Sequence, residues 1–147
     1  MQAFHFSLET LLKVRRIEEE EMQIKLAEAS AKVKTEKERL ALLNDKLTAH
    51  INEYRSKQRD KISVSILNVF HYYNDKLKED IIDQHSCVDM ANKQFQQCLV
   101  LLEQAVKARK LVENLREKRL AEYQAECLAE EQRVIDEQGL QVYSRNK

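Results

Sequence analysis

The sequence has 147 residues, with no proline, no tryptophan and a single glycine, and 34% of its residues are charged. Lysine and arginine together number 25, as do aspartate and glutamate, so the net charge is zero. Because turns need glycine and proline for their special backbone angles, this composition argues against sheets and loop-rich folds. It is typical of a long helix or coiled coil.

The balance of charge and hydropathy also limits the partners. The chain has no excess of basic residues with which to neutralise a phosphate backbone, so nucleic acid is not an expected partner. No apolar stretch approaches the roughly 20 residues of a membrane span, and the first residues lack the apolar region of a signal peptide. We therefore expect a cytoplasmic protein without direct membrane insertion.

A heptad pattern runs through the first third of the chain. Steps of alternately four and three residues meet Leu8, Leu12, Arg15, Glu19, Met22, Leu26, Ala29, Val33, Glu36, Leu40, Leu43, Leu47, His50 and Tyr54. Most of these residues are apolar and the frame never slips, which predicts a helix over about 7–58 that packs on a partner helix. Ser7 is the expected amino-terminal cap, with Phe6 and Leu11 placed as a hydrophobic staple.

The only tight connection is predicted at about 59–64. A polar run there leads to Ser63, which repeats the cap-and-staple pattern. Ser65 satisfies the capping preference equally well. The pair Asn74 and Asp75 is the rival turn and would make two helices of nearly equal length, but no capping signature follows it.

A second helix is predicted over about 64–138, with Gly139 as its stop. Its apolar stripe comprises Ile66, Phe70, Tyr73, Leu77, Ile81, Gln84, Val88, Ala91, Phe95, Cys98, Leu102, Ala105, Arg109 and Val112, and continues as Leu120, Tyr123, Cys127 and Val134. Antiparallel pairing about the turn leaves residues 116–138 beyond the paired region. The expected fold is all-α: one coiled-coil domain over 1–147, an antiparallel hairpin whose second helix is longer and protrudes.

No catalytic, metal or cofactor site is expected, because two helices side by side form no enclosed pocket and no nucleotide, hydrolase or zinc motif is present. The histidines are scattered. His50 lies on the seam, the row of heptad positions along which the two helices pack, and is expected to be a neutral core residue. The three cysteines lack metal-site spacing and are expected to be free thiols. Charged seam residues such as Glu19 and Glu36 usually fix register or partner choice.

Aromatic residues gather next to the predicted turn. Phe70, Tyr72 and Tyr73 lie within one helical turn, and Tyr72 points away from the seam. At least one aromatic ring should therefore be exposed. Both a binding patch and an ordinary exposed aromatic residue remain open as interpretations.

Taken together, these motifs resemble the FliJ family of flagellar export proteins. An FxFxLxxLLxxR pattern places Phe4, Phe6, Leu8, Leu11, Leu12 and Arg15, followed by an acidic stretch and a long heptad helix. The second half is similar to the family's terminal helix, with an LExLxEK-like segment at 111–118, then Tyr123 and the triplet Glu130, Glu131 and Gln132. NEYRS at 52–56 also resembles a family segment before the turn.

The resemblance implies a non-enzymatic part of the flagellar type III export apparatus, similar in fold to the central stalk of rotary ATPases. It implies binding to the hexameric export ATPase through the open end of the hairpin, contact with the membrane export gate and interaction with export chaperones. It places the protein peripherally at the cytoplasmic face of the flagellar base. The implied ATPase-binding residues are Phe4, Phe6, Leu8, Leu11, Arg15, Tyr123, Glu130 and Glu131, and the implied gate-binding residues are Phe70, Tyr72, Tyr73 and Leu77.

Two other functions fit the same pattern. A self-associating scaffold protein would form a parallel dimer of one long helix, roughly twice the length of the hairpin. The stalk rod of another rotary ATPase or of a virulence secretion system would share the hairpin and differ only in its partner.

Overall fold

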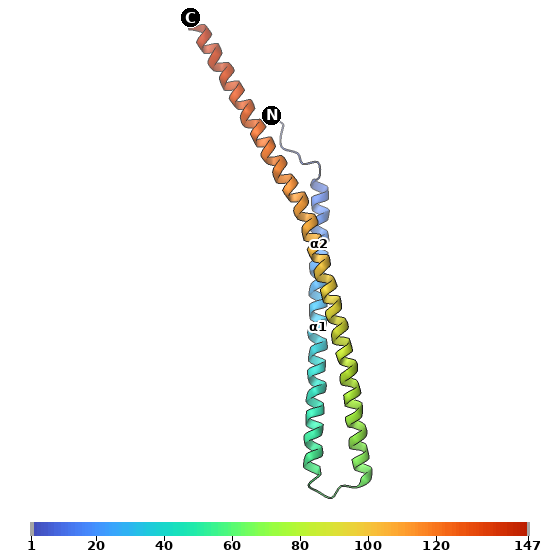
Figure 1. Ribbon diagram of the computed structural model, residues 1–147. Helices are drawn as coiled ribbons and strands as arrows, with labels where there is room; N and C mark the ends of the chain where they lie inside the picture. Colours follow the sequence, from blue (N-terminus) through green and yellow to red (C-terminus); the bar gives the residue numbers. More distant parts are fainter. Residues whose placement is uncertain (1, 147) are drawn as a thin grey trace. The chain divides into compact units, whose positions relative to one another are not determined.

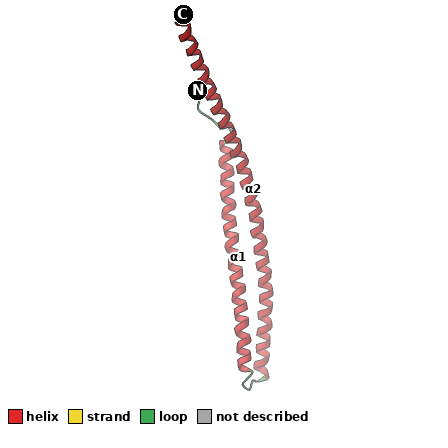
Figure 2. Ribbon diagram, turned by 60° about the vertical axis from the view of Figure 1, so that its left-hand side comes forward, coloured by secondary structure: helices red, strands yellow, loops and turns green. Residues whose placement is uncertain are grey.

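The computed structural model describes residues 2–146 and contains two long helices packed against each other (Figures 1 and 2). Helix α1 spans Glu9–Lys57 and helix α2 spans Val64–Arg145. No strand occurs in the described part of the chain. The predicted all-α hairpin with a longer second helix is confirmed, which excludes the single long helix of a parallel scaffold dimer.

The start of α1 differs from the prediction. The backbone N–H of Leu12 donates to the carbonyl of Leu8 at 2.9 Å, while Glu9 donates to Phe6 at 3.2 Å in a preceding turn. Leu8, and not Ser7, therefore occupies the capping position, and the helix begins at Glu9. The predicted Ser7 cap is wrong, because the turn before the helix carries Phe6 into the core.

The connection lies at 58–63, one residue before the predicted segment. Ser63 caps α2: its Oγ accepts from the Ile66 N–H at 3.4 Å and its carbonyl accepts from the Leu67 N–H at 3.1 Å. Among the described residues none has a positive φ, so the connection needs no glycine. The rival turn at Asn74 and Asp75 is wrong, since both lie inside α2.

The carboxy-terminal bound of α2 is also corrected. The helix runs through Gly139 and ends at Arg145, beyond the predicted end at 138. Gly139 keeps a negative φ and has no left-handed cap geometry. A single glycine disfavours a helix by only about 1 kcal/mol relative to alanine. Good helix formers on both sides of it outweigh that penalty.

The predicted seam of α1 is confirmed by burial. Every predicted seam position from Leu8 to Tyr54 is at least partly buried, and Leu12 is fully buried. On α2 the core residues are Leu77, Val88 and Ala91. Three predicted stripe positions are instead exposed: Ile66, Tyr73 and Val134.

Contacts divide the described chain into two units. One is Met22–Leu102, in which the later part of α1 pairs with the first part of α2 across the connection. The other combines residues 2–21 with 103–146, and within it every residue from 128 to 146 is exposed. None of the described helices is both long and apolar enough to cross a membrane. The single-domain organisation stays a prediction.

Candidate functional site

The residues before α1 form a non-helical segment, the amino-terminal strap (residues 2–8), which lies against α2 (Figure 1). The Tyr123 hydroxyl donates to the Gln2 carbonyl at 2.6 Å. The Phe4 and Tyr123 rings lie 5.5 Å apart between centroids, tilted by 47°. Phe6 is only 4% exposed. The Gln2 carbonyl and the Phe4 ring therefore hold the strap to Tyr123 of α2.

The burial of Phe6 explains why an apolar residue precedes the first helix. Burying a phenylalanine side chain contributes roughly 1.5–3 kcal/mol. The chain itself covers this ring, so no partner is needed to bury it. Leu8 and Leu11 are also partly buried. Arg15 pairs with Glu18 on its own helix at 2.9 Å.

Tyr123 of α2 contacts the strap at two points, the Gln2 carbonyl and the Phe4 ring. A hydrogen bond with the Cys127 thiol, burial and the nearby charge of Glu130 together raise the pKa of Tyr123 above its ordinary value. The neutral hydroxyl that donates to Gln2 is therefore the favoured form. Glu130 and Glu131 themselves are exposed.

An ion-pair network joins the two helices below the strap. Arg109 of α2 hydrogen-bonds to Glu19 of α1 and, at 2.5 Å, to Glu113 of its own helix. Glu113 also lies 3.5 Å from Arg16. The hydrogen bond from Arg109 is the main cause that lowers the pKa of Glu113, and the same carboxylates raise the pKa of Arg109. Glu19 on the seam thus has a partner within the chain, as expected for a register-fixing residue.

A second pair, Glu9 with Arg116 at 3.1 Å, lies between the network and the strap. Sequence reasoning missed this pair and Glu113. Pairing between residues about a hundred positions apart depends on the register of the two helices, and no local pattern encodes it.

The carboxy-terminal segment, residues 128–146, contains the last part of α2 and exposes apolar side chains. Leu128, Ile135 and Val142 recur at intervals of seven residues, and Val134 and Leu140 are also exposed. These residues were missed as site candidates, although their seven-residue spacing was visible in the sequence. An exposed apolar repeat of this kind is a candidate interaction surface.

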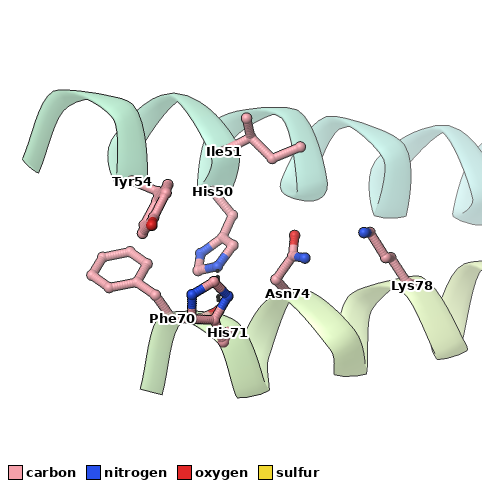
Figure 3. Close-up of a pocket in the computed structure, with 7 residues that line it drawn as sticks. All are labelled: His50, Ile51, Tyr54, Phe70, His71, Asn74 and Lys78. Atoms are coloured by element: carbon pink, nitrogen blue, oxygen red, sulfur yellow. Dashed lines mark hydrogen bonds between the residues drawn. The ribbon is translucent and has the colours of Figure 1, made fainter. Parts of the chain in front are cut away.

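Near the connection, aromatic rings surround the buried His50, which is 8% exposed (Figure 3). Its Nε2 lies 3.0 Å from the Phe70 carbonyl, and its ring stacks on Phe70 and meets Tyr73 edge-on. A cleft of about 180 Å³ remains beside it. The residues that line the cleft are His50, Ile51, Tyr54, Phe70, His71, Asn74 and Lys78.

The four predicted gate-binding residues separate into two kinds. Tyr72 is 74% exposed and Tyr73 is 45% exposed. Phe70 is partly covered by His50, Tyr54 and the Lys57 ammonium, and Leu77 lies in the core. Of these four residues, the two tyrosines are exposed, Phe70 is partly buried at the edge of the cleft, and Leu77 is buried.

Within residues 2–146, no group of three or more potential metal ligands is found. Cys87, Cys98 and Cys127 are free thiols. Three surfaces are candidates for a functional role: the strap with Tyr123, the apolar repeat of the carboxy-terminal segment, and the exposed tyrosines near the connection.

The family model described as the flagellar FliJ protein matches residues 4–147, which is nearly the whole chain. Curated proteins and solved structures gave no match. The match begins at Phe4, so it includes most of the strap as well as both helices. The chain belongs to the flagellar FliJ protein family and is a component of flagellar type III export.

Proposed function

We propose that this chain couples the hexameric export ATPase to the membrane export gate, at the cytoplasmic face of the flagellar base. It does so as a binding rod with no catalysis of its own, and export chaperones are a further class of partner. Family membership favours this function over a stalk rod in an unrelated rotary ATPase. The observation that carries the proposal is the exposed apolar repeat of the carboxy-terminal segment.

The ATPase contact is assigned to the unit that contains the strap and the carboxy-terminal segment. Leu128 and Ile135 are 67% and 60% exposed, and a helix that displays such a repeat gains by burying it against a partner. Glu130 and Glu131 flank the repeat and would form exchangeable polar contacts at its rim. Such weak contacts suit a rod that meets several subunits of a ring in turn.

The test is binding of the purified chain to the purified export ATPase. Replacing Leu128 and Ile135 with glutamine removes apolar surface and keeps helix propensity. We expect the dissociation constant to rise about tenfold, the effect of losing one well-buried contact. The matched control replaces Ile24 and Leu42, which are similarly exposed, with glutamine. Equal binding by both double variants and the unchanged chain would exclude this surface.

The gate contact is assigned to Tyr72 and Tyr73, with exposed Ile66 and Val69 beside them. Large aromatic side chains are the residues most enriched at energetically dominant contacts. Replacing both tyrosines with serine should reduce co-isolation of the gate protein and leave ATPase binding unchanged. If gate association persists in this variant, the assignment to the tyrosines is wrong.

A further inference from the structure

Three residues assigned to ATPase binding are already in contact with or covered by the chain itself. Phe4 faces the ring of Tyr123, and Phe6 is buried. Tyr123 in turn donates to the strap backbone at Gln2. Aromatic side chains that cover one another in this way cannot offer the same surfaces to a partner. A partner that binds the sides of Phe4 and Tyr123 that face each other must first separate the strap from α2.

The contact between the strap and α2 leaves part of the helix surface uncovered. An open groove of about 590 Å³ remains between its first residues and α2. The α2 residues that line the groove are Leu115, Lys118, Arg119, Glu122, Tyr123 and Glu126. His5 and Ser7 of the strap are exposed to solvent. Gln2 and Phe4 thus contact Tyr123 of α2, while an open groove remains beside these contacts.

The groove has the chemistry of a peptide-docking surface. Tyr123 supplies both a ring face and a hydroxyl donor, and the charged side chains of Lys118, Arg119 and Glu122 form a polar rim. The two phenylalanines of the strap are two positions apart, a spacing that puts side chains on one side of an extended chain. The surface therefore fits a non-helical peptide with the strap's own pattern, whose first aromatic ring lies against Tyr123.

We propose that this face of α2 is a docking surface for an extended peptide bearing alternate aromatic residues. Its resident occupant is the strap, whose contact with α2 covers the facing sides of Phe4 and Tyr123 until the export ATPase displaces it. The masking of these residues depends on the ATPase contact proposed above, whereas the docking of a peptide on this face does not. Masking makes the apparent affinity for the ATPase proportional to the fraction of molecules in which the strap is released, so the affinity is lowest when that fraction is small.

Docking is tested with the synthetic peptide QAFHFS, which copies residues 2–7, labelled with a fluorophore. We expect it to bind the full chain carrying Phe4→Ser and Phe6→Ser, whose own strap is undocked, and to bind the unchanged chain at least about tenfold more weakly. The peptide QASHSS is the control and should bind neither. Failure of QAFHFS to bind the double variant, with helicity intact by circular dichroism, would overturn the docking surface. If QAFHFS binds the double variant and the unchanged chain equally, the strap does not occupy this surface.

A second measurement follows the strap directly. The chain has no tryptophan, so Phe4→Trp supplies a single reporter whose quenching by acrylamide reports its exposure. Adding Tyr123→Phe removes the hydroxyl that holds Gln2 and should raise the quenching constant about twofold or more. Tyr72→Phe, at an exposed tyrosine in the other unit, should leave it unchanged. Unchanged quenching in the Tyr123 variant would show that the hydroxyl does not hold the strap.

Masking is tested by ATPase affinity. Tyr123→Phe keeps the ring and loosens the strap, so the variant should bind the export ATPase about threefold more tightly than the unchanged chain. Equal or weaker binding would overturn masking. Absence of ATPase binding by either chain would overturn the proposed ATPase contact, and masking with it, while the peptide experiment still decides the docking surface.

Discussion

The side-chain amide of Gln84 on α2 donates to both the backbone carbonyl and the carboxylate of Glu36 on α1, at 2.9 Å and 2.5 Å. Both residues belong to the predicted seams, and both are partly buried. A polar pair of this kind tolerates no slip in register, because a shift of the helices would leave a half-buried carboxylate without its donor.

Gln84→Ala should lower the free energy of unfolding by about 1–3 kcal/mol, because it removes hydrogen bonds to a charged and poorly hydrated group. Urea unfolding followed by circular dichroism measures the change. The control Gln96→Ala removes an exposed glutamine from the same helix and should change the stability by less than about 0.5 kcal/mol. Equal effects of the two substitutions would contradict a special role for the pair.

His50→Ala should destabilise the protein by about 1–3 kcal/mol, from the lost hydrogen bond to the Phe70 carbonyl and the lost burial against Phe70 and Tyr73. His85 on α2 is exposed and provides a control of the same residue type. We expect His85→Ala to leave the unfolding midpoint almost unchanged. A shift as large as that of His50→Ala would argue against the packed cluster.

Glu113 makes the stability of the strap-containing unit dependent on pH. The folded-state pKa of Glu113 is lowered from 4.5 by Arg109, so the interaction stabilises the fold above that pH and is lost as the pH falls through the folded-state pKa. Glu113→Gln should therefore reduce the urea midpoint at pH 7, and the difference from the unchanged chain should shrink as the solution is acidified. Glu117→Gln, at an exposed position, is the control. A difference that stays constant from pH 7 to acid would rule out this linkage.

Gly139→Ala should stabilise the carboxy-terminal segment by about 0.5–1 kcal/mol, since glycine loses more backbone freedom than alanine in a helix. A methyl group at this position meets no atom within 4 Å. Amide hydrogen exchange of residues 128–146 should slow in this variant. Faster or unchanged exchange would mean that Gly139 does not sit in a helix in solution.

Much of the fold follows from sequence because its elements are long and periodic. Many residues reinforce the same heptad frame in α1, so single polar positions such as Arg15 and Glu19 do not disturb it. The cap at Ser63 was also predictable, since it depends on neighbours only three or four residues away. The errors at Ser7 and Gly139 arose where weak local signals met stronger influences: burial of Phe6 at one end and continuous helix propensity at the other.

The sequence alone determined the class of fold, two antiparallel helices with one connection, because composition and periodicity act locally and accumulate along the chain. The tertiary structure decided which surfaces are free. Phe4 and Tyr123 are well over a hundred residues apart, and only the packing of the strap against α2 brings their rings together. Likewise, Leu77 and Tyr72 are near neighbours in sequence, yet helical geometry against α1 buries one and exposes the other. Contacts between distant residues depend on register and on the path of the strap, which no local pattern specifies.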